Sequence, residues 1–154
     1  MKLYFAGPDV FRPDAASWAD EMRRLAAAHD HRPLIPLDNT APDAAGIYAV
    51  NLEMIRNADA VVANLNPFRG CEPDSGTCFE VGAAIALGKR VVAYIESGET
   101  LRERVQRELG GAVGYDRDGM LIEDFKLPLN LMLAVPCEVV VGGIEAALER
   151  LSRT

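Results

Sequence analysis

The chain is poor in the residues from which disulfide frameworks and metal sites are built. Its 154 residues include three cysteines and two histidines, and Cys71, Cys78 and Cys137 do not have the spacing of a zinc site. An odd number of cysteines also argues against a disulfide scaffold. We therefore expect a single domain, residues 1–154, that is stabilised by an apolar core and works without a metal in the reducing cytoplasm.

Positive charge and long apolar stretches are scarce as well. The 16 lysines and arginines are outnumbered by 23 aspartates and glutamates, which gives a net charge of -7. An acidic surface repels phosphate backbones and anionic lipids, so nucleic-acid polymers and membranes are poor partners for this chain. The apolar runs fall well short of the roughly 18 residues that a bilayer-spanning helix requires, and the N-terminal residues predict a strand rather than a signal peptide.

The sequence also lacks the glycine-rich loops that bind nucleotide phosphates. No G-x-G-x-x-G motif follows the first predicted strand, and no Walker-type lysine loop is present. The turn after that strand reads Gly7, Pro8, Asp9, and the carboxylate of Asp9 would repel a pyrophosphate. Nicotinamide cofactors and nucleoside triphosphates are therefore disfavoured as ligands.

What the sequence does contain is a regular alternation of strand and helix patterns. Strands are expected at residues 2–6, 34–37, 60–65, 90–95 and 138–141, and helices at residues 13–28, 47–55, 78–87, 101–109, 127–133 and 144–152. The almost wholly apolar runs at 60–65 and 90–95 are typical of parallel strands that are buried on both faces. The pattern predicts a three-layer α/β domain with a central, mostly parallel sheet, whose ligands bind beyond the carboxyl ends of the strands.

Candidate catalytic chemistry is concentrated in residues 73–84. Glu80 is a candidate carboxylate nucleophile with Asp74 as a second carboxylate, because two such groups roughly 5 Å apart suit a retaining glycosyl transfer. With an ordinary pKa of about 4, such a nucleophile is ionised at pH 7. The same spacing fits a purely structural alternative, in which Thr77 and Glu80 form the capping box of a helix. Gly76 lets the backbone approach a ligand closely, and Tyr4 is either a core aromatic or a hydroxyl donor to Glu80.

Five short segments occur in a characteristic order. They are residues 3–7 (LYFAG), 35–39 (IPLDN), 55–65 (IRNADAVVANL), 74–82 (D-x-G-T-x-x-E-x-G) and 130–132 (NLM). Through this ordered set the chain resembles the nucleoside 2-deoxyribosyltransferase family. The resemblance implies a Rossmann-like, flavodoxin-type fold and an enzyme that moves a 2-deoxyribosyl group between nucleobases with retention at C1′. It also implies that no cofactor or metal takes part.

The resemblance assigns roles to individual residues through these motifs. Glu80 matches the family's nucleophile, Tyr4 the tyrosine that orients it, and Asp74 the aspartate that binds the deoxyribose and assists with the base. Asn130 matches an asparagine that holds the sugar hydroxyl from a neighbouring subunit, with Met132 beside it. The implied partners are deoxynucleosides and free nucleobases, and the implied assembly is a homo-oligomer, a dimer or larger, with shared active sites.

One position departs from the family pattern. Where family members often carry an aspartate that contacts and protonates the base, this chain has Asn51. A neutral amide forms hydrogen bonds with a base but cannot deliver a proton, so protonation of the leaving base falls to Asp74 or to a water. The residues expected to bind substrate also include Gly76 and Phe11, an aromatic residue that can stack on a base.

Two alternative functions remain open at this point. A related enzyme could hydrolyse the N-glycosidic bond of a 2′-deoxynucleoside 5′-phosphate, but residues 7–12 form an acidic loop without the serine that such enzymes use for phosphate. The segment from Asn130 to Met132 also favours the transferase. A nucleoside-sensing module without catalysis is the other alternative, because a fold does not determine a function.

Overall fold

A five-stranded sheet forms the centre of the computed structural model, which describes residues 1–153. Its strands are β1 (Lys2–Ala6), β2 (Arg32–Leu34), β3 (Ala60–Asn64), β4 (Arg90–Ile95) and β5 (Glu138–Val141). They lie in the order β2-β1-β3-β4-β5, and every neighbouring pair is parallel. This is the flavodoxin-like order, so the predicted α/β class with a parallel central sheet is confirmed.

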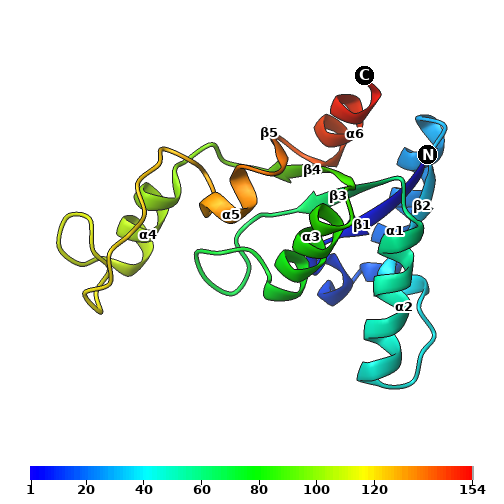
Figure 1. Cartoon of the computed structure of the whole chain (residues 1–154), viewed down its shortest axis with the longest axis horizontal. Helices are drawn as coiled ribbons and strands as arrows, with labels where there is room; N and C mark the ends of the chain where they lie inside the picture. Colours follow the sequence, from blue (N-terminus) through cyan, green and yellow to red (C-terminus); the bar gives the residue numbers. More distant parts are fainter. Residues whose placement is uncertain (154) are drawn as a thin grey trace.

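Two helices cover one face of this sheet. α1 (Ala15–Ala28) and α6 (Ile144–Ser152) lie there, as Figure 1 shows. Trp18 and Leu148 from these helices join Leu3, Val62 and Val92 from three strands in one buried cluster. Side chains along a strand alternate between the two faces of the sheet, so Leu3 packs in this cluster while the next residue, Tyr4, packs on the opposite face.

The opposite face carries α2 (Ala44–Asn57) and α3 (Ser75–Ala86). Ile55 of α2 and Val81 of α3 pack with Tyr4, Val61 and Val91 in a second buried cluster. The sheet is thus a middle layer between two helical layers, as expected from the alternation of strands and helices. The side chains of interest for function lie on this second face.

A less buried region follows β4. Figure 1 shows α4 (Leu101–Leu109) and the segment after it extending away from the sheet. A small apolar cluster that includes Cys71, Leu101 and Ile122 connects this region to the loop after β3. The chain then returns through α5 (Leu131–Ala134), which packs on α3. Among residues 1–153, no helix is both long enough and apolar enough to span a membrane.

Several predicted boundaries were wrong by one or more residues, and three of them were set by a nearby proline or capping residue. The second strand ends at Leu34 rather than at residue 37, because Pro36 begins a short 3₁₀ turn, Pro36–Asp38. α3 begins at Ser75 rather than at residue 78, since Asp74 caps it. The helix expected at residues 127–133 is confined to α5, which Asn130 caps.

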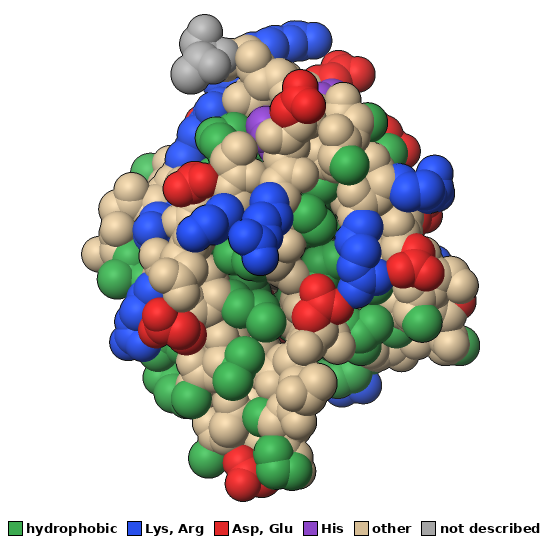
Figure 2. Space-filling view, turned by 90° about the vertical axis from the view of Figure 1, so that its right-hand side faces the viewer, with side chains coloured by type: hydrophobic (Ala, Val, Ile, Leu, Met, Phe, Trp, Pro, Cys, Tyr) green, Lys and Arg blue, Asp and Glu red, His purple; other side chains and the backbone are tan. Residues whose placement is uncertain are grey.

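The surface carries charges of both signs. On the face shown in Figure 2, lysine and arginine side chains lie among aspartate and glutamate side chains, with apolar side chains between them. A nucleic-acid polymer binds most readily to a continuous basic stripe, and this face does not present one.

Candidate active site

A buried tyrosine and a glutamate meet between the sheet and α3. Tyr4 lies in β1 with none of its side chain exposed, and its hydroxyl group donates a hydrogen bond of 2.5 Å to Oε1 of Glu80. The two residues are 76 positions apart in the sequence. A buried phenol needs a hydrogen-bond partner, and here the partner fixes the glutamate side chain. The other oxygen of Glu80, Oε2, makes no hydrogen bond within residues 1–153.

The surroundings of Glu80 favour its neutral form. The pKa of its carboxyl group is raised from 4.5 to about 7, chiefly because the group is buried; the hydrogen bond from Tyr4 lowers this pKa, and the nearby charge of Asp74 raises it. The pKa of the Tyr4 hydroxyl is also raised, first by burial and then by the charge of Glu80. The carboxyl group is therefore half ionised near neutral pH, rather than fully ionised as its ordinary pKa suggested.

Asp74, and not Glu80, caps the first turn of α3. Its Oδ2 accepts hydrogen bonds from the backbone N–H and the hydroxyl group of Thr77, both at 2.9 Å. The structural alternative of a Thr77–Glu80 capping box is therefore wrong, because the cap lies three residues earlier. Oδ1 of Asp74 makes no hydrogen bond to any described residue. A Cβ on Gly76 would lie 3.1 Å from Oδ2 of Asp74, so a side chain there would crowd the cap.

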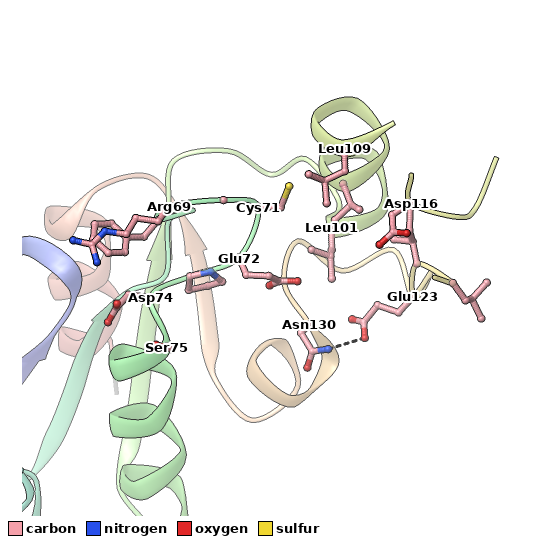
Figure 3. Close-up of a pocket in the computed structure, with 16 residues that line it drawn as sticks. Arg69, Cys71, Glu72, Asp74, Ser75, Leu101, Leu109, Asp116, Glu123 and Asn130 are labelled. Atoms are coloured by element: carbon pink, nitrogen blue, oxygen red, sulfur yellow. Dashed lines mark hydrogen bonds between the residues drawn. The ribbon is translucent and has the colours of Figure 1, made fainter. Parts of the chain in front are cut away.

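A cavity of 680 Å³ lies beside the start of α3, between the loop after β3 and the region of α4. Asp74 and Asn130 both line it, whereas Glu80 and Tyr4 do not. Figure 3 shows Asn130 directed toward Glu123, to which its Nδ2 donates a hydrogen bond of 2.8 Å. Its Oδ1 accepts from the backbone N–H of Met132 at 3.0 Å, so both ends of the Asn130 amide are engaged within its own chain.

Two further predicted residues have largely exposed side chains. Phe11 is 59% exposed and stacks on Phe68 with 5.8 Å between the ring centroids. The guanidinium of Arg69 lies over both rings. Neither Phe68 nor Arg69 was foreseen, because nothing in the loop sequence indicates which residues meet across it. Met132 has 72% of its surface exposed and forms no part of the Tyr4–Glu80 pair.

Asn51 is half-buried on α2 and takes part in a network that sequence reasoning missed. The side-chain amide of Asn39 donates to Oδ1 of Asn51 at 3.1 Å and to the backbone oxygen of Ile47 at 3.0 Å. The ring of Tyr48, on the same helix, lies 5.9 Å from the ring of Phe79, the residue before Glu80. Asn39 follows a strand at the ligand-binding end of the sheet, and this position is the feature of the sequence that could have indicated its place in the network.

A buried carboxylate lies where the strand order reverses. The carboxyl ends of β1 and β3 are adjacent, and in this class of sheet ligands bind at that point. Asp9 follows β1 with 7% of its surface exposed, and its Oδ2 accepts a hydrogen bond of 2.8 Å from the amide of Asn64 at the end of β3. Arg12 lies 3.8 Å from its other oxygen. The loop after β1 thus presents a carboxylate where a phosphate-binding loop presents N–H groups.

Comparisons with known proteins agree with this architecture. A family model described as Nucleoside 2-deoxyribosyltransferase matches residues 3–132. Among solved structures, the chain is similar to a 2-deoxyribosyltransferase from Leishmania mexicana at 39% sequence identity and a TM-score of 0.84. That similarity covers 97% of this chain and 95% of the Leishmania chain.

More distant matches share the fold. A 2-deoxyribosyltransferase from Bacillus psychrosaccharolyticus has 24% identity and a TM-score of 0.53, over 64% of this chain and 75% of that chain. The CMP N-glycosidase BcmB of Clostridium botulinum has 13% identity and a TM-score of 0.57, over the whole of both chains. An uncharacterised protein of Schizosaccharomyces pombe is 28% identical over 114 residues, which are 68% of this chain and 54% of that protein, so the chain spans about half of this curated relative. With the family model matching residues 3–132 and the Leishmania fold overlapping nearly the whole chain, this protein belongs to the nucleoside 2-deoxyribosyltransferase family.

Proposed function

We propose that the protein transfers 2-deoxyribose between nucleobases with Glu80 as its nucleophile. The contact between the Tyr4 hydroxyl and Oε1 of Glu80 carries this proposal, because it holds the carboxylate in one orientation and leaves Oε2 free. In the first step Oε2 bonds to C1′ of a deoxynucleoside while the glycosidic bond breaks and the base leaves with a proton. In the second step a new base attacks C1′, loses a proton and releases Glu80. Two inversions give net retention.

Asp74 is proposed to bind the sugar and to assist the departing base. Its Oδ2 is occupied by the cap of α3, whereas Oδ1 is available for a sugar hydroxyl or for a proton. The proton for the leaving base comes from Asp74 or from a water, because the amide of Asn51 cannot deliver one. These steps involve no cofactor or metal.

The electrostatics support a nucleoside rather than a nucleotide as substrate. Four carboxylate side chains and one arginine line the cavity at the start of α3. The buried Asp9 adds a further negative charge in the loop after β1. A 5′-phosphate placed near these groups would be repelled, and this favours the transferase over hydrolysis of a nucleotide.

The proposed site is shared between subunits. Asn130 bonds only to groups of its own segment, Glu123 and α5, and its own Glu80 is not among them. Next to it Met132 and Val135 are each 72% exposed, although both are apolar. We propose that a second copy covers these side chains in a homo-oligomer of at least two subunits, and that Asn130 serves the neighbour's site, the role which the family resemblance implies for it.

The decisive experiment is base exchange. A deoxynucleoside incubated with a labelled free base should yield labelled nucleoside, and quenched protein should carry a deoxyribosyl adduct on Glu80. The Glu80→Ala variant should lose both signals, whereas the control Glu53→Ala, at an exposed position of α2, should keep them. Exchange that persists in Glu80→Ala would refute the nucleophile. Release of free deoxyribose at the same rate with and without an acceptor base would indicate a hydrolase instead.

A further inference from the structure

The carboxylate of Glu123 holds two neighbouring groups, one with each oxygen. Oε2 accepts a hydrogen bond of 2.8 Å from Nδ2 of Asn130, and Oε1 accepts one of 2.9 Å from the backbone N–H of Leu131. The positive side chains of Arg102 and Lys126 pair with the next residue, Asp124. Within residues 1–153, Glu123 is therefore bonded to N–H donors and not to a cation.

These contacts fix the side-chain amide of Asn130 in one orientation. Its Nδ2 group faces an acceptor on Glu123, and its Oδ1 accepts a hydrogen bond of 3.0 Å from the backbone N–H of Met132. Turning the amide around would place its oxygen against a carboxylate and its NH₂ group against an N–H donor. Each end keeps one further hydrogen or lone pair, so the amide still has a donor and an acceptor for a ligand.

Glu123 and Asn130 are each attached to the folded core by the residue that precedes them. Ile122 is buried in the small apolar cluster that connects the region of α4 to the loop after β3. Leu129 is buried in the cluster that contains Tyr4. The hydrogen bond between Glu123 and Asn130 therefore joins two segments whose backbones are anchored separately.

Both side chains lie beside a space that a ligand can enter. Glu123 and Asn130 line the cavity of 680 Å³ at the start of α3, and so does Asp74, the proposed sugar-binding residue. Figure 3 shows the side chains of Glu123 and Asn130 directed toward each other among the residues that line this cavity. A sugar hydroxyl both donates and accepts, which matches the donor and the acceptor that remain on the Asn130 amide.

We propose that Glu123 is a positioning residue, which holds the amide of Asn130 in place for a sugar hydroxyl of the nucleoside. An asparagine that rotates freely loses side-chain entropy when it binds, and the bond to Glu123 reduces this cost before the substrate arrives. The role is the same whether the sugar lies in the same subunit or in its neighbour. The inference rests on the proposed transferase function and concerns a residue outside the five motif segments.

The first test exchanges donor and acceptor within the pair. In Glu123→Gln one carboxylate oxygen becomes an NH₂ group, so one N–H donor faces another donor, and kcat/KM for the deoxynucleoside should fall about tenfold. Asn130→Asp places two carboxylates in contact and should cost at least as much. The double variant restores a hydrogen bond between amide and carboxylate in the reverse direction, so its kcat/KM should exceed that of Asn130→Asp by about fivefold or more.

The chain contains a matched control for this exchange. Oε1 of Glu53 accepts a hydrogen bond of 2.9 Å from Nδ2 of Asn57, and both residues are exposed on α2. Glu53→Gln and Asn57→Asp, alone and together, should leave kcat/KM within about twofold of wild type.

A second measurement separates positioning from simple stabilisation of α5. A residue that only caps this helix would affect every donor alike. A residue that positions Asn130 matters least for a donor that lacks the hydroxyl which Asn130 holds. We therefore compare a 2′-deoxynucleoside with its derivatives that lack the 3′- or the 5′-hydroxyl. For one of them the loss caused by Glu123→Gln should shrink from about tenfold to about twofold or less.

Circular dichroism melting shows whether each variant is folded at the assay temperature. If Glu123→Gln is not, the comparison of Asn130→Asp with the double variant still decides the question. Equal losses on all three donors, or a double variant that is no more active than Asn130→Asp, would overturn the positioning role of Glu123. A wild-type protein without any base exchange would instead refute the transferase function itself.

Discussion

Glu80, the proposed nucleophile, has a carboxyl group whose ionisation falls within the physiological pH range. Its pKa of about 7 is the result of burial, which the hydrogen bond from Tyr4 only partly offsets. Only the ionised carboxylate attacks C1′, so kcat/KM for base exchange should rise with pH and reach half its plateau near pH 7. In Tyr4→Phe the lost hydrogen bond should move that midpoint to higher pH. A pH–rate profile of both proteins measures this, and an unchanged midpoint in Tyr4→Phe would contradict it.

The same side chain reduces stability at alkaline pH. The carboxyl group binds its proton more tightly in the folded state, with a pKa of about 7 against an ordinary value of 4.5. Its contribution to the free energy of unfolding is therefore fully present below about pH 4.5 and is lost as the pH rises through 7. Glu80→Gln should be more stable than wild type by about 1–3 kcal/mol at pH 8 and nearly equal at pH 4. Urea unfolding at the two pH values provides the measurement, and equal stabilities at pH 8 would contradict the assignment.

At the scale of a single element, α3 depends on Asp74 for its first turn. Asp74→Ala should cost about 0.5–2 kcal/mol because the Thr77 N–H loses its acceptor. Asp74→Asn keeps a capping oxygen and should retain nearly full stability while base exchange declines. Thermal melts combined with exchange rates separate the two roles. If Asp74→Asn is as active as wild type, Asp74 acts only as a cap.

Most elements were predictable because their signals are local. The apolar runs that became β3 and β4, and the alternation that gave the parallel sheet, need no knowledge of distant residues. The errors arose where a single polar or proline residue decides a boundary. Pro36 ended β2 early, and Asp74 and Asn130 began α3 and α5 by accepting backbone hydrogen bonds. Such choices depend on side-chain rotamers, which residue patterns do not specify.

The candidate site was predictable to a different degree. Motifs indicated Glu80, Tyr4 and Asp74, and the structure brings the first two into contact. The roles of these residues are predictions that await the exchange assay. The orienting contact from Asn39 to Asn51 could not be predicted, because it depends on the geometry of a loop and a helix that meet only in the folded chain.

At the scale of the whole molecule, the proposal of shared active sites predicts complementation between inactive variants. Glu80→Ala and Asn130→Ala should each be inactive alone. Subunits of the two variants, unfolded together and refolded as a mixture, should regain activity, since a mixed dimer contains one site with both residues intact. For random dimers roughly a quarter of the wild-type sites are restored. Mixing that restores no activity, in a sample shown to be oligomeric by sedimentation, would contradict the shared site.

The all-parallel sheet has a consequence for how the candidate site is assembled during synthesis. β1 pairs only with β2 and β3, and its tyrosine meets a glutamate 76 residues further along the chain. No hairpin can form early, so β1 finds its partner strands only after later segments of the chain have been synthesised. Nascent chains that stop before α3 would already contain three strands of the sheet yet lack Glu80, the acid on which the proposed chemistry depends.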